Sequence, residues 1–429
     1  MPLRRWRGAG RHAIFESVAR ADPAPASGDE IRACRWTGAA LAALLAFGFL
    51  TLWTRRFWPV SVVQVGIFAL ALGWTAGAAL GRLRLALHPL MIPLAGAVLV
   101  GCAQLAFGTS AYPWATEVAT LDWFTRLAVF TVAFQAGRHP RVAERLLRGL
   151  LWFALGIALA AVLQRFTTPD RIFWIFPTDS ETAMGPFVYH NQFAQFIETV
   201  LPIALFGAVG TPRRTWSHLL MAAAFFASAV VAVSRAGVAL AVLETAAVLA
   251  VLRRKAGRRV ILAAAGLAGL AAVFVLAVGW EPLWQKFQRR DQLAERRLLY
   301  ASTLEMIAER PAMGFGLGAW SAVYPAYARF DDGKRDNQAH SDWLQWTAEG
   351  GLPMLALMLA LAALIAKAAW RTVWGLGLTA VLLNALVDYP FQQRPVFGYY
   401  FFALAGLICA AAAQHRAERA GEDVDVQPD

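Results

Sequence analysis

Three side chains, Arg235, Arg296 and His340, are the strongest candidates for chemistry in this sequence. A planar guanidinium presents paired hydrogen-bond donors to the oxygens of a phosphate. An imidazole, with an unperturbed pKa of about 6.5, can accept a proton from a hydroxyl group near neutral pH. Each residue also has an ordinary interpretation, since arginines at helix ends reach toward the membrane surface and loop histidines are commonly solvated. The elements that position the three residues therefore decide between these readings.

The composition indicates a membrane protein. The chain is 58% hydrophobic and only 16% charged, with a mean hydropathy of +0.48. Soluble domains average about 45–50% apolar and about 25% charged residues. Apolar stretches long enough to cross a hydrocarbon core of about 30 Å recur along the chain. We therefore predict an all-α polytopic membrane protein of about twelve transmembrane helices, at 37–53, 58–80, 87–107, 121–137, 146–163, 190–209, 217–233, 236–252, 260–279, 352–370, 372–389 and 395–413.

The distribution of basic residues predicts the orientation of these helices. The N-terminal segment and every second loop after it carry about 24 lysines and arginines, whereas the opposite short loops carry only 6. Cytoplasmic loops of membrane proteins are enriched in lysine and arginine, so both termini are expected on the cytoplasmic side of a bacterial inner membrane. The net charge of +12 is then a signal of topology, and no nucleic-acid partner is needed.

The chain divides into five segments on this reading. The largest segment outside the membrane is a partly helical loop between the ninth and tenth spans, on the side away from the cytoplasm. Within it, RRLLYASTLEMIAERP predicts a helix that ends at Pro311, and a second helix is expected from near Asn337 into the tenth span. The segments are a basic cytoplasmic N-terminus (1–36), nine spans (37–279), a periplasmic loop (280–351), three spans (352–413) and a disordered cytoplasmic tail (414–429).

Four local groups of polar residues fall on the same, extracytoplasmic side as this loop. The first group, GPFVYHNQFA, contains His190 and Asn191, and the second is the turn SRAG with Arg235. The other groups are the loop itself, with Arg296, Arg297, Tyr300, His340, Asp342 and Glu349, and DYPFQQRP, which begins at Asp388. Asp342 or Glu349 could orient His340, although helical spacing places Asp342 off the face of His340 and favours a cap or a sugar ligand.

No cofactor or metal site is expected. The three cysteines, Cys34, Cys102 and Cys409, lie near or within apolar segments without ligand-like spacing. The run GFGLG, from Gly314 to Gly318, does not follow a strand in a βαβ unit, and its side of the membrane lacks nucleotides. We interpret it as a tight turn in which the backbone approaches a ligand or another loop.

From about Gly185 onward the chain resembles the O-antigen ligase and polysaccharide polymerase superfamily of bacterial inner-membrane glycosyltransferases. The matching features are GPFVYHNQFAQFIETVLPIAL, the SRAG turn, Arg296 followed four residues later by Tyr300, a helix ending at Pro311, GFGLG, AHSDWLQ and AEGGLP. Ser341 stands where many members have asparagine. Arg297 adjoins Arg296, and the spacing to Tyr300 favours Arg296. The N-terminal half contributes spans without a matching motif.

The resemblance implies metal-independent, inverting glycosyl transfer at the periplasmic face, with Arg235, Arg296 and His340 as catalytic residues. The donor would be a glycan on undecaprenyl diphosphate, and the acceptor hydroxyl would belong to lipid A-core or another surface glycan. Arg235 and Arg296 would bind the diphosphate, and His340 would activate the hydroxyl. The lipid tail could lie in a groove between spans, so membrane lipids are expected partners. A polymerase joining lipid-linked repeat units shares this donor.

A twelve-helix transporter is the competing class. It should place charged residues near the membrane midplane, where Arg126 and Glu244 are the main candidates. The polar groups instead gather at one face beside a long loop, which favours chemistry on a lipid-linked donor. A non-catalytic scaffold for envelope assembly ranks last.

Overall fold

The structure is a computed structural model that describes residues 28–54, 56–180, 182–210, 215–256, 261, 264–266, 268–269, 292–329 and 336–424. The described elements are almost entirely helical. In chain order they are α2 (Gly28–Leu50), α3 (Trp58–Ala79), α4 (Met91–Ala106), α5 (Pro113–Gly137), α6 (Pro140–Thr167), β1 (Arg171–Ile172), β2 (Phe176–Pro177), α7 (His190–Gly210), α8 (Thr215–Val231), α9 (Arg235–Ala256), α12 (Gln292–Glu309), α13 (Trp320–Val323), the 3₁₀ helix η2 (Tyr324–Ala326), α14 (Asp342–Thr372), α15 (Leu376–Asn384), α16 (Pro390–Gln393) and α17 (Pro395–Val424).

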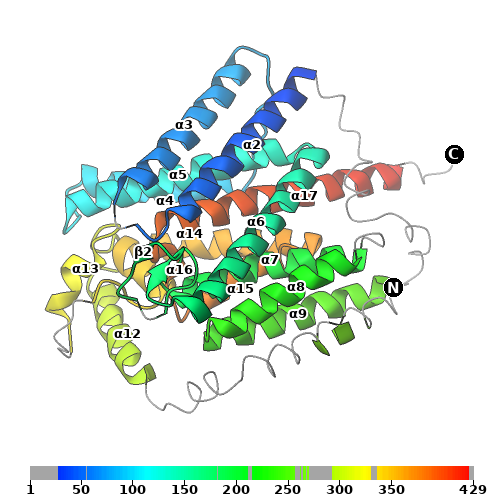
Figure 1. Cartoon of the computed structure of the whole chain (residues 1–429). Coiled ribbons are helices and arrows are strands. Elements are labelled where there is room, and N and C mark those ends of the chain that lie inside the picture. Colours follow the sequence, from blue (N-terminus) through cyan, green and yellow to red (C-terminus); the bar gives the residue numbers. More distant parts are fainter. Residues whose placement is uncertain are drawn as a thin grey trace, which may run out of the picture.

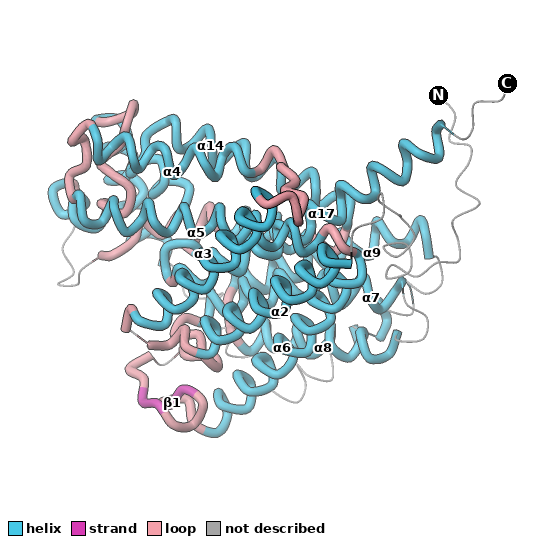
Figure 2. Tube along the Cα trace, turned by 90° about the horizontal axis from the view of Figure 1, so that it is seen from above, coloured by secondary structure: helices cyan, strands magenta, loops and turns pink. Residues whose placement is uncertain are grey.

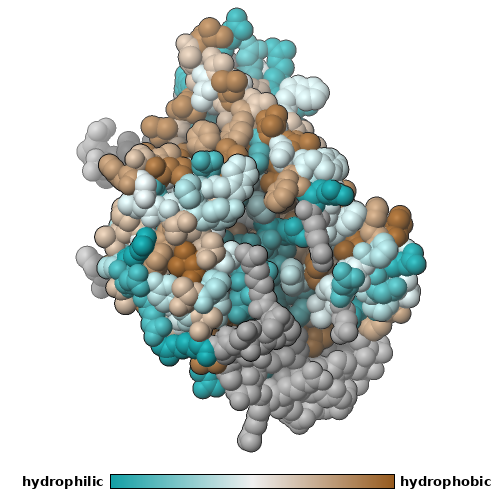
Figure 3. Space-filling model, turned by 90° about the vertical axis from the view of Figure 1, so that its left-hand side faces the viewer, coloured by the Kyte–Doolittle hydropathy of each residue, from teal (hydrophilic) through white to brown (hydrophobic). Residues whose placement is uncertain are grey.

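The long helices form one bundle, with the short elements gathered at one end (Figure 1). Helix α5 packs against α4 and α17, and α7 packs against α8, α9 and α15. Helices α12, α13 and α16 lie at this end, which we call the loop end (Figure 1). Helix α17 projects past the other helices at the opposite end (Figure 2). Figure 3 views the loop end and shows hydrophilic residues over much of its surface. The polar groups identified in the sequence therefore belong to one end of the bundle.

The apolar runs correspond to helices, as the sequence predicts. Seven helices in the described part of the chain are long and apolar enough to cross a membrane, namely α2, α3, α6, α7, α9, α14 and α17. Helices α4 and α8 are shorter and apolar, at two further predicted positions. The predicted span 121–137 lies within α5, which also carries Glu117, Asp122 and Arg126. Proline at the first turn of α3, α5 and α6 fits these starts, because the first helical N–H groups have no intrahelical partner.

The predicted spans near the C-terminus differ from the structure in two places. The span expected at 372–389 is replaced by α15, whose nine residues extend only about 13 Å at 1.5 Å per residue. The turn before α15 is buried inside the protein, with Thr372 2% and Trp374 6% exposed. Helix α17 continues to Val424, past the predicted end at residue 413 and into the predicted tail. Most of the predicted span 260–279, and loop residues 280–291 and 330–335, lie outside the described residues.

The two helices expected in the large loop are present. Helix α12 covers RRLLYASTLEMIAE and ends just before Pro311. Helix α14 begins at Asp342 and runs into the tenth predicted span, with a break at Gly351, where φ is 68° and ψ is −169°. Glycine adopts this backbone conformation readily, and Pro353 cannot donate a backbone hydrogen bond, so the sequence explains the break.

Candidate functional site

The candidate site is built around the start of α14 and the segment 385–391, which joins α15 to α16. Ser341 is the N-cap of α14, and its hydroxyl accepts a hydrogen bond from the backbone N–H of Leu344 at 3.3 Å. The N–H of Asp342 donates to the backbone oxygens of Ala385 (3.0 Å) and Asp388 (3.2 Å). The Asp342 carboxylate in turn accepts from the N–H of Phe391 at 3.1 Å. Asp342 is fully buried, and its hydrogen bonds join the two segments. We call the contact between residues 340–342 and the segment 385–391 the junction.

His340, the first residue of the junction, has a strained conformation. Its φ is +55°, in the left-handed region that residues other than glycine seldom adopt. The imidazole ring packs edge-on against the ring of Tyr389, with 4.6 Å between centroids. Its Nδ1 atom is buried without a hydrogen-bond partner among the described residues. Burial, and secondarily the positive charge of Arg296, lower the pKa of His340 to about 4, so the ring is neutral and can accept a proton at neutral pH.

Arg296 and Tyr300 lie one turn apart on α12, and both contact the junction. A guanidinium nitrogen of Arg296 donates to the backbone oxygen of Val387 at 2.7 Å. The Tyr300 hydroxyl donates to the backbone oxygen of His340 at 3.0 Å. Residues four apart share one face of a helix, so the Arg-x-x-x-Tyr spacing lets α12 contact both the segment 385–391 and the residues before α14. Arg297, the neighbouring arginine, is exposed.

The first turns of α7 support the junction from the other side. The side chains of Asn191 and Gln195 hydrogen-bond to the carboxylate of Asp388, Gln195 at 3.2 Å. Asp388 also accepts from the N–H of Tyr389 at 3.0 Å and is only 6% exposed. Burial raises the pKa of the Asp388 carboxyl, and the charge of Arg296 partly offsets this effect. His190, the first residue of α7, is half-buried.

Arg235 is the first residue of α9, which begins against α7. The buried Ser234 hydroxyl accepts from the N–H of Gly237 at 3.2 Å and so caps the helix start. Gly237 lies so close to α7 that a Cβ atom there would be 2.6 Å from the Cβ of Ala194. Ala194 adjoins Gln195, which contacts Asp388. The SRAG turn therefore brings half-buried Arg235 to the helix that supports Asp388.

A family model described as O-antigen ligase matches residues 218–359, which include Arg235, Arg296, Tyr300 and His340. The match covers about a third of the chain and supports a similarity to the O-antigen ligase family over these residues. A comparison with curated proteins gave no match. The apolar helices and the family together indicate a multi-pass membrane protein of the O-antigen ligase or polymerase type.

Within the O-antigen ligase region, GFGLG is a tight turn, as predicted, and its backbone approaches α14. Gly314, Gly316 and Gly318 all have positive φ. The N–H groups of Phe315 and Gly316 donate to the backbone oxygens of Ala348 (3.0 Å) and Glu349 (2.9 Å). The Glu349 side chain accepts from the N–H of Trp320 and from the side chain of Gln345. Glu349 thus contacts the glycine turn, and it is linked to the residue before His340 through Gln345, which accepts from the N–H of Ala339 at 3.0 Å.

The sequence analysis did not identify as site residues two further residues, Arg126 and Gln104, that contact the segments around the site. Arg126 of α5 is buried, stacks on Trp123 and donates to the backbone oxygen of Phe391 at 3.2 Å. Gln104 of α4 donates to the backbone oxygens of Met313 and Glu349 and accepts from the N–H of Leu317. Both are polar residues within apolar helices, which is the one signal in the sequence that could have indicated them.

Among the described residues, no three histidine, cysteine, aspartate or glutamate side chains are arranged to hold a metal ion. At the junction, a neutral imidazole lies beside an arginine and a buried carboxyl group. This combination suits proton transfer next to an anionic group.

Proposed function

We propose that this chain transfers a glycan from undecaprenyl diphosphate to an acceptor hydroxyl at the periplasmic face, as a metal-independent, inverting glycosyltransferase of the O-antigen ligase type. The observation that carries the proposal is the pairing of His340 with Arg296. The half-buried neutral imidazole of His340, just before α14, and the guanidinium of Arg296, on α12, approach the same short segment within the family region. The acceptor is lipid A-core or another surface glycan.

In the proposed reaction, His340 takes the proton of the acceptor hydroxyl as its oxygen attacks the anomeric carbon of the donor sugar. The bond from that carbon to the phosphate oxygen breaks, and undecaprenyl diphosphate leaves with the electron pair. Attack from the opposite face inverts the anomeric centre. General base catalysis of this kind contributes about 10²–10⁴ in rate. The anionic donor would also raise the pKa of His340, because a nearby negative charge favours the imidazolium.

Arg296 and Arg235 would bind the diphosphate and stabilise the charge that develops on it. Arg296 has five N–H donors, and the contact with Val387 uses one of its terminal nitrogens. The remaining N–H groups can donate to phosphate oxygens while the hydrogen bond to Val387 is kept. In this proposal Tyr300, Asp342 and Asp388 position the arginine and the histidine, while His190, Asn191 and Arg297 lie beside them as candidate sugar contacts.

Two observations argue against the transporter alternative. Arg126 is engaged with Phe391 and Trp123 next to the junction, so it is accounted for as a structural residue. The polar groups of the junction lie at one end of the bundle rather than along a path through it (Figure 1). A polymerase that joins two lipid-linked repeat units fits the same site, since it differs only in the acceptor.

The test is transfer by the purified protein in nanodiscs, with an undecaprenyl-diphosphate glycan and, separately, lipid A-core or a second lipid-linked repeat unit. Product on lipid A-core supports the ligase, and a ladder of longer lipid-linked glycans supports the polymerase. We expect His340→Ala to abolish transfer and Arg296→Ala to weaken donor binding more than Arg297→Ala does. Activity of His340→Ala equal to wild type would remove the histidine from the mechanism.

A further inference from the structure

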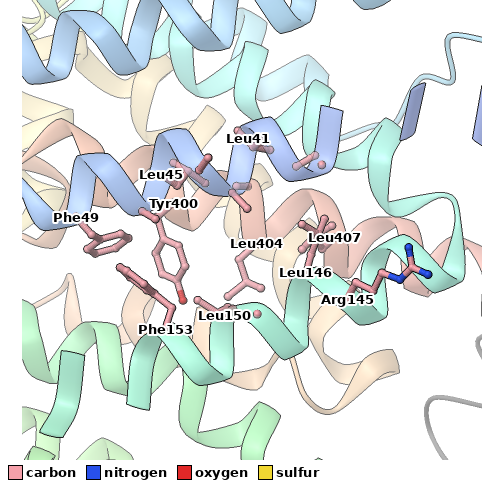
Figure 4. Close-up of a pocket in the computed structure, with 17 residues that line it drawn as sticks. Leu41, Leu45, Phe49, Arg145, Leu146, Leu150, Phe153, Tyr400, Leu404 and Leu407 are labelled. Carbon is pink, nitrogen blue, oxygen red and sulfur yellow. The ribbon is translucent and has the colours of Figure 1, made fainter. Parts of the chain in front are cut away.

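A second feature lies between the helices of the bundle, away from His340. Helices α2, α6 and α17, with Ala133 of α5, line a half-open cavity of about 370 Å³ (Figure 4). Its walls are aliphatic and aromatic side chains, among them Leu41, Leu45, Leu150 and Leu404. The hydroxyl of Tyr400, which also lines the cavity, is engaged with Thr199 at 2.6 Å. The cavity therefore presents a hydrocarbon surface, with Arg145 as its one charged lining residue.

An aromatic cluster closes the cavity toward the candidate site. Phe49 is its centre, with ring centroids 5.1 Å from Tyr400, 6.2 Å from Phe153 and 5.0 Å from Phe196. Phe196 belongs to α7, two turns or less from Asn191, so the cluster separates the cavity from the junction near His340. A chain anchored beside His340 cannot enter the cavity through this cluster without displacing it.

The opposite end of the cavity leads to the basic end of α6. Leu407 of α17 lines the cavity and lies against Gly137, and the side chain of Gln414 donates to the backbone oxygen of Arg138. Arg145 lies at this end, with its guanidinium directed away from the aromatic residues (Figure 4). Arg145 is exposed and has no hydrogen bond or ion pair within the described part of the chain, whereas Arg148 of the same helix pairs with Glu144.

The dimensions of the cavity match one half of a bilayer. The lining residues of α2 run from Gly38 to Phe49, about 16 Å of helix at 1.5 Å per residue. The hydrocarbon core of a membrane is about 30 Å thick, so the cavity spans the depth of one leaflet. A single acyl chain with its head group at the basic end fits these limits.

We propose that this cavity binds an acyl chain of an anionic phospholipid from the leaflet on the Arg145 side, with the lipid phosphate held by Arg145. Charge complementarity selects the anionic head group, since a guanidinium pairs two donors with phosphate oxygens. The aromatic closure excludes the tail of a donor whose diphosphate lies beside His340. The lipid site is independent of the glycosyl transfer proposed above.

The test is native mass spectrometry of the full-length protein taken from nanodiscs that contain phosphatidylglycerol and phosphatidylethanolamine. We expect wild type to retain phosphatidylglycerol and Arg145→Ala to bind it about tenfold more weakly, the loss expected for about one charge-assisted hydrogen bond. Arg141→Ala, an exposed arginine on the same helix outside the cavity, is the matched control and should bind as wild type does.

A second variant tests the cavity itself. Gly149 lines it, and a Cβ atom there would meet no other atom within 4 Å, so Gly149→Phe should fill the space without a backbone clash. We expect this variant to keep its thermal stability and to lose the retained lipid. Equal retention by the Arg145 and Arg141 variants, or full retention by Gly149→Phe, would overturn the proposal. Loss of glycosyl transfer in Gly149→Phe with lipid retention unchanged would instead assign the cavity to the donor tail.

Discussion

The pKa of His340 makes a quantitative prediction about how activity and stability depend on pH. Burial and the charge of Arg296 lower this pKa from 6.5 to about 4 in the folded protein. Between these two values the unfolded chain binds a proton that the folded protein does not bind, so stability falls as the pH falls. The slope from this one group is about 1.4 kcal/mol per pH unit, which gives a loss of about 2 kcal/mol between pH 6.5 and pH 5.

The comparison of wild type with His340→Asn isolates this contribution. Asparagine tolerates the positive φ of residue 340 and does not titrate, so the variant keeps the backbone and removes the charge change. Asp388 titrates in both proteins and cancels in the difference. We expect the free energy of unfolding, measured by denaturant titration in micelles at pH 6.5 and pH 5, to fall by about 2 kcal/mol more in wild type than in His340→Asn.

The pH dependence of transfer provides the second measurement. The acid limb of kcat/KM reports the pKa of the free enzyme, so we expect it well below pH 6. The acid limb of kcat reports the donor complex and should lie at higher pH, because the diphosphate stabilises the imidazolium. An acid limb of kcat/KM with its midpoint near 6.5 would show that His340 is neither buried nor close to Arg296, and the reasoning would be refuted.

Two other variants test the support of the site and the interior of the bundle. Gly314→Ala should destabilise by several kcal/mol and abolish transfer, because φ is +63° and the new Cβ would lie 2.4 Å from the backbone of Glu349. Its control, Gly156→Ala, meets no atom within 4 Å and should raise the thermal midpoint slightly. Glu244→Leu should stabilise by about 1–3 kcal/mol, because both buried carboxylate oxygens lack hydrogen-bond partners among the described residues. Glu198→Leu, which removes a carboxylate that accepts a hydrogen bond, should destabilise instead. A loss of transfer without a loss of stability in Glu244→Leu would show that the carboxyl group has a functional role.

The sequence located most helices because their apolar runs are continuous and long. It also identified α12, its end before Pro311 and the tight GFGLG turn, which are features of local chemistry. It predicted a full span at 372–389 because hydropathy does not distinguish a segment buried in lipid from one buried in protein. Thr372 and Trp374 are covered by neighbouring helices, so part of this apolar segment is buried in protein.

The candidate site was predictable as a set of residues but not as an arrangement. The motifs indicated which arginines, tyrosine and histidine to examine, and in the structure Arg296 and Tyr300 both contact the junction from α12. The residues that contact and support the site are far apart in the sequence. Gln195 contacts Asp388 across 193 positions, a pairing that no local pattern in one sequence encodes. Glu349, which the sequence offered as a residue that could orient His340, hydrogen-bonds to Trp320 and Gln345, and Gln345 contacts the backbone of Ala339.

The segment 385–391 explains why the site needs so many helices around it. A residue held at positive φ costs about 1–3 kcal/mol, so His340 keeps this conformation only if neighbouring contacts favour it. The segment that faces His340 receives a guanidinium from Arg296, the carboxylate of Asp342 and a second guanidinium from Arg126. These contacts come from α12, α14 and α5, which no short stretch of sequence connects. A histidine held by these contacts is preorganised, as the proposed general base would need to be.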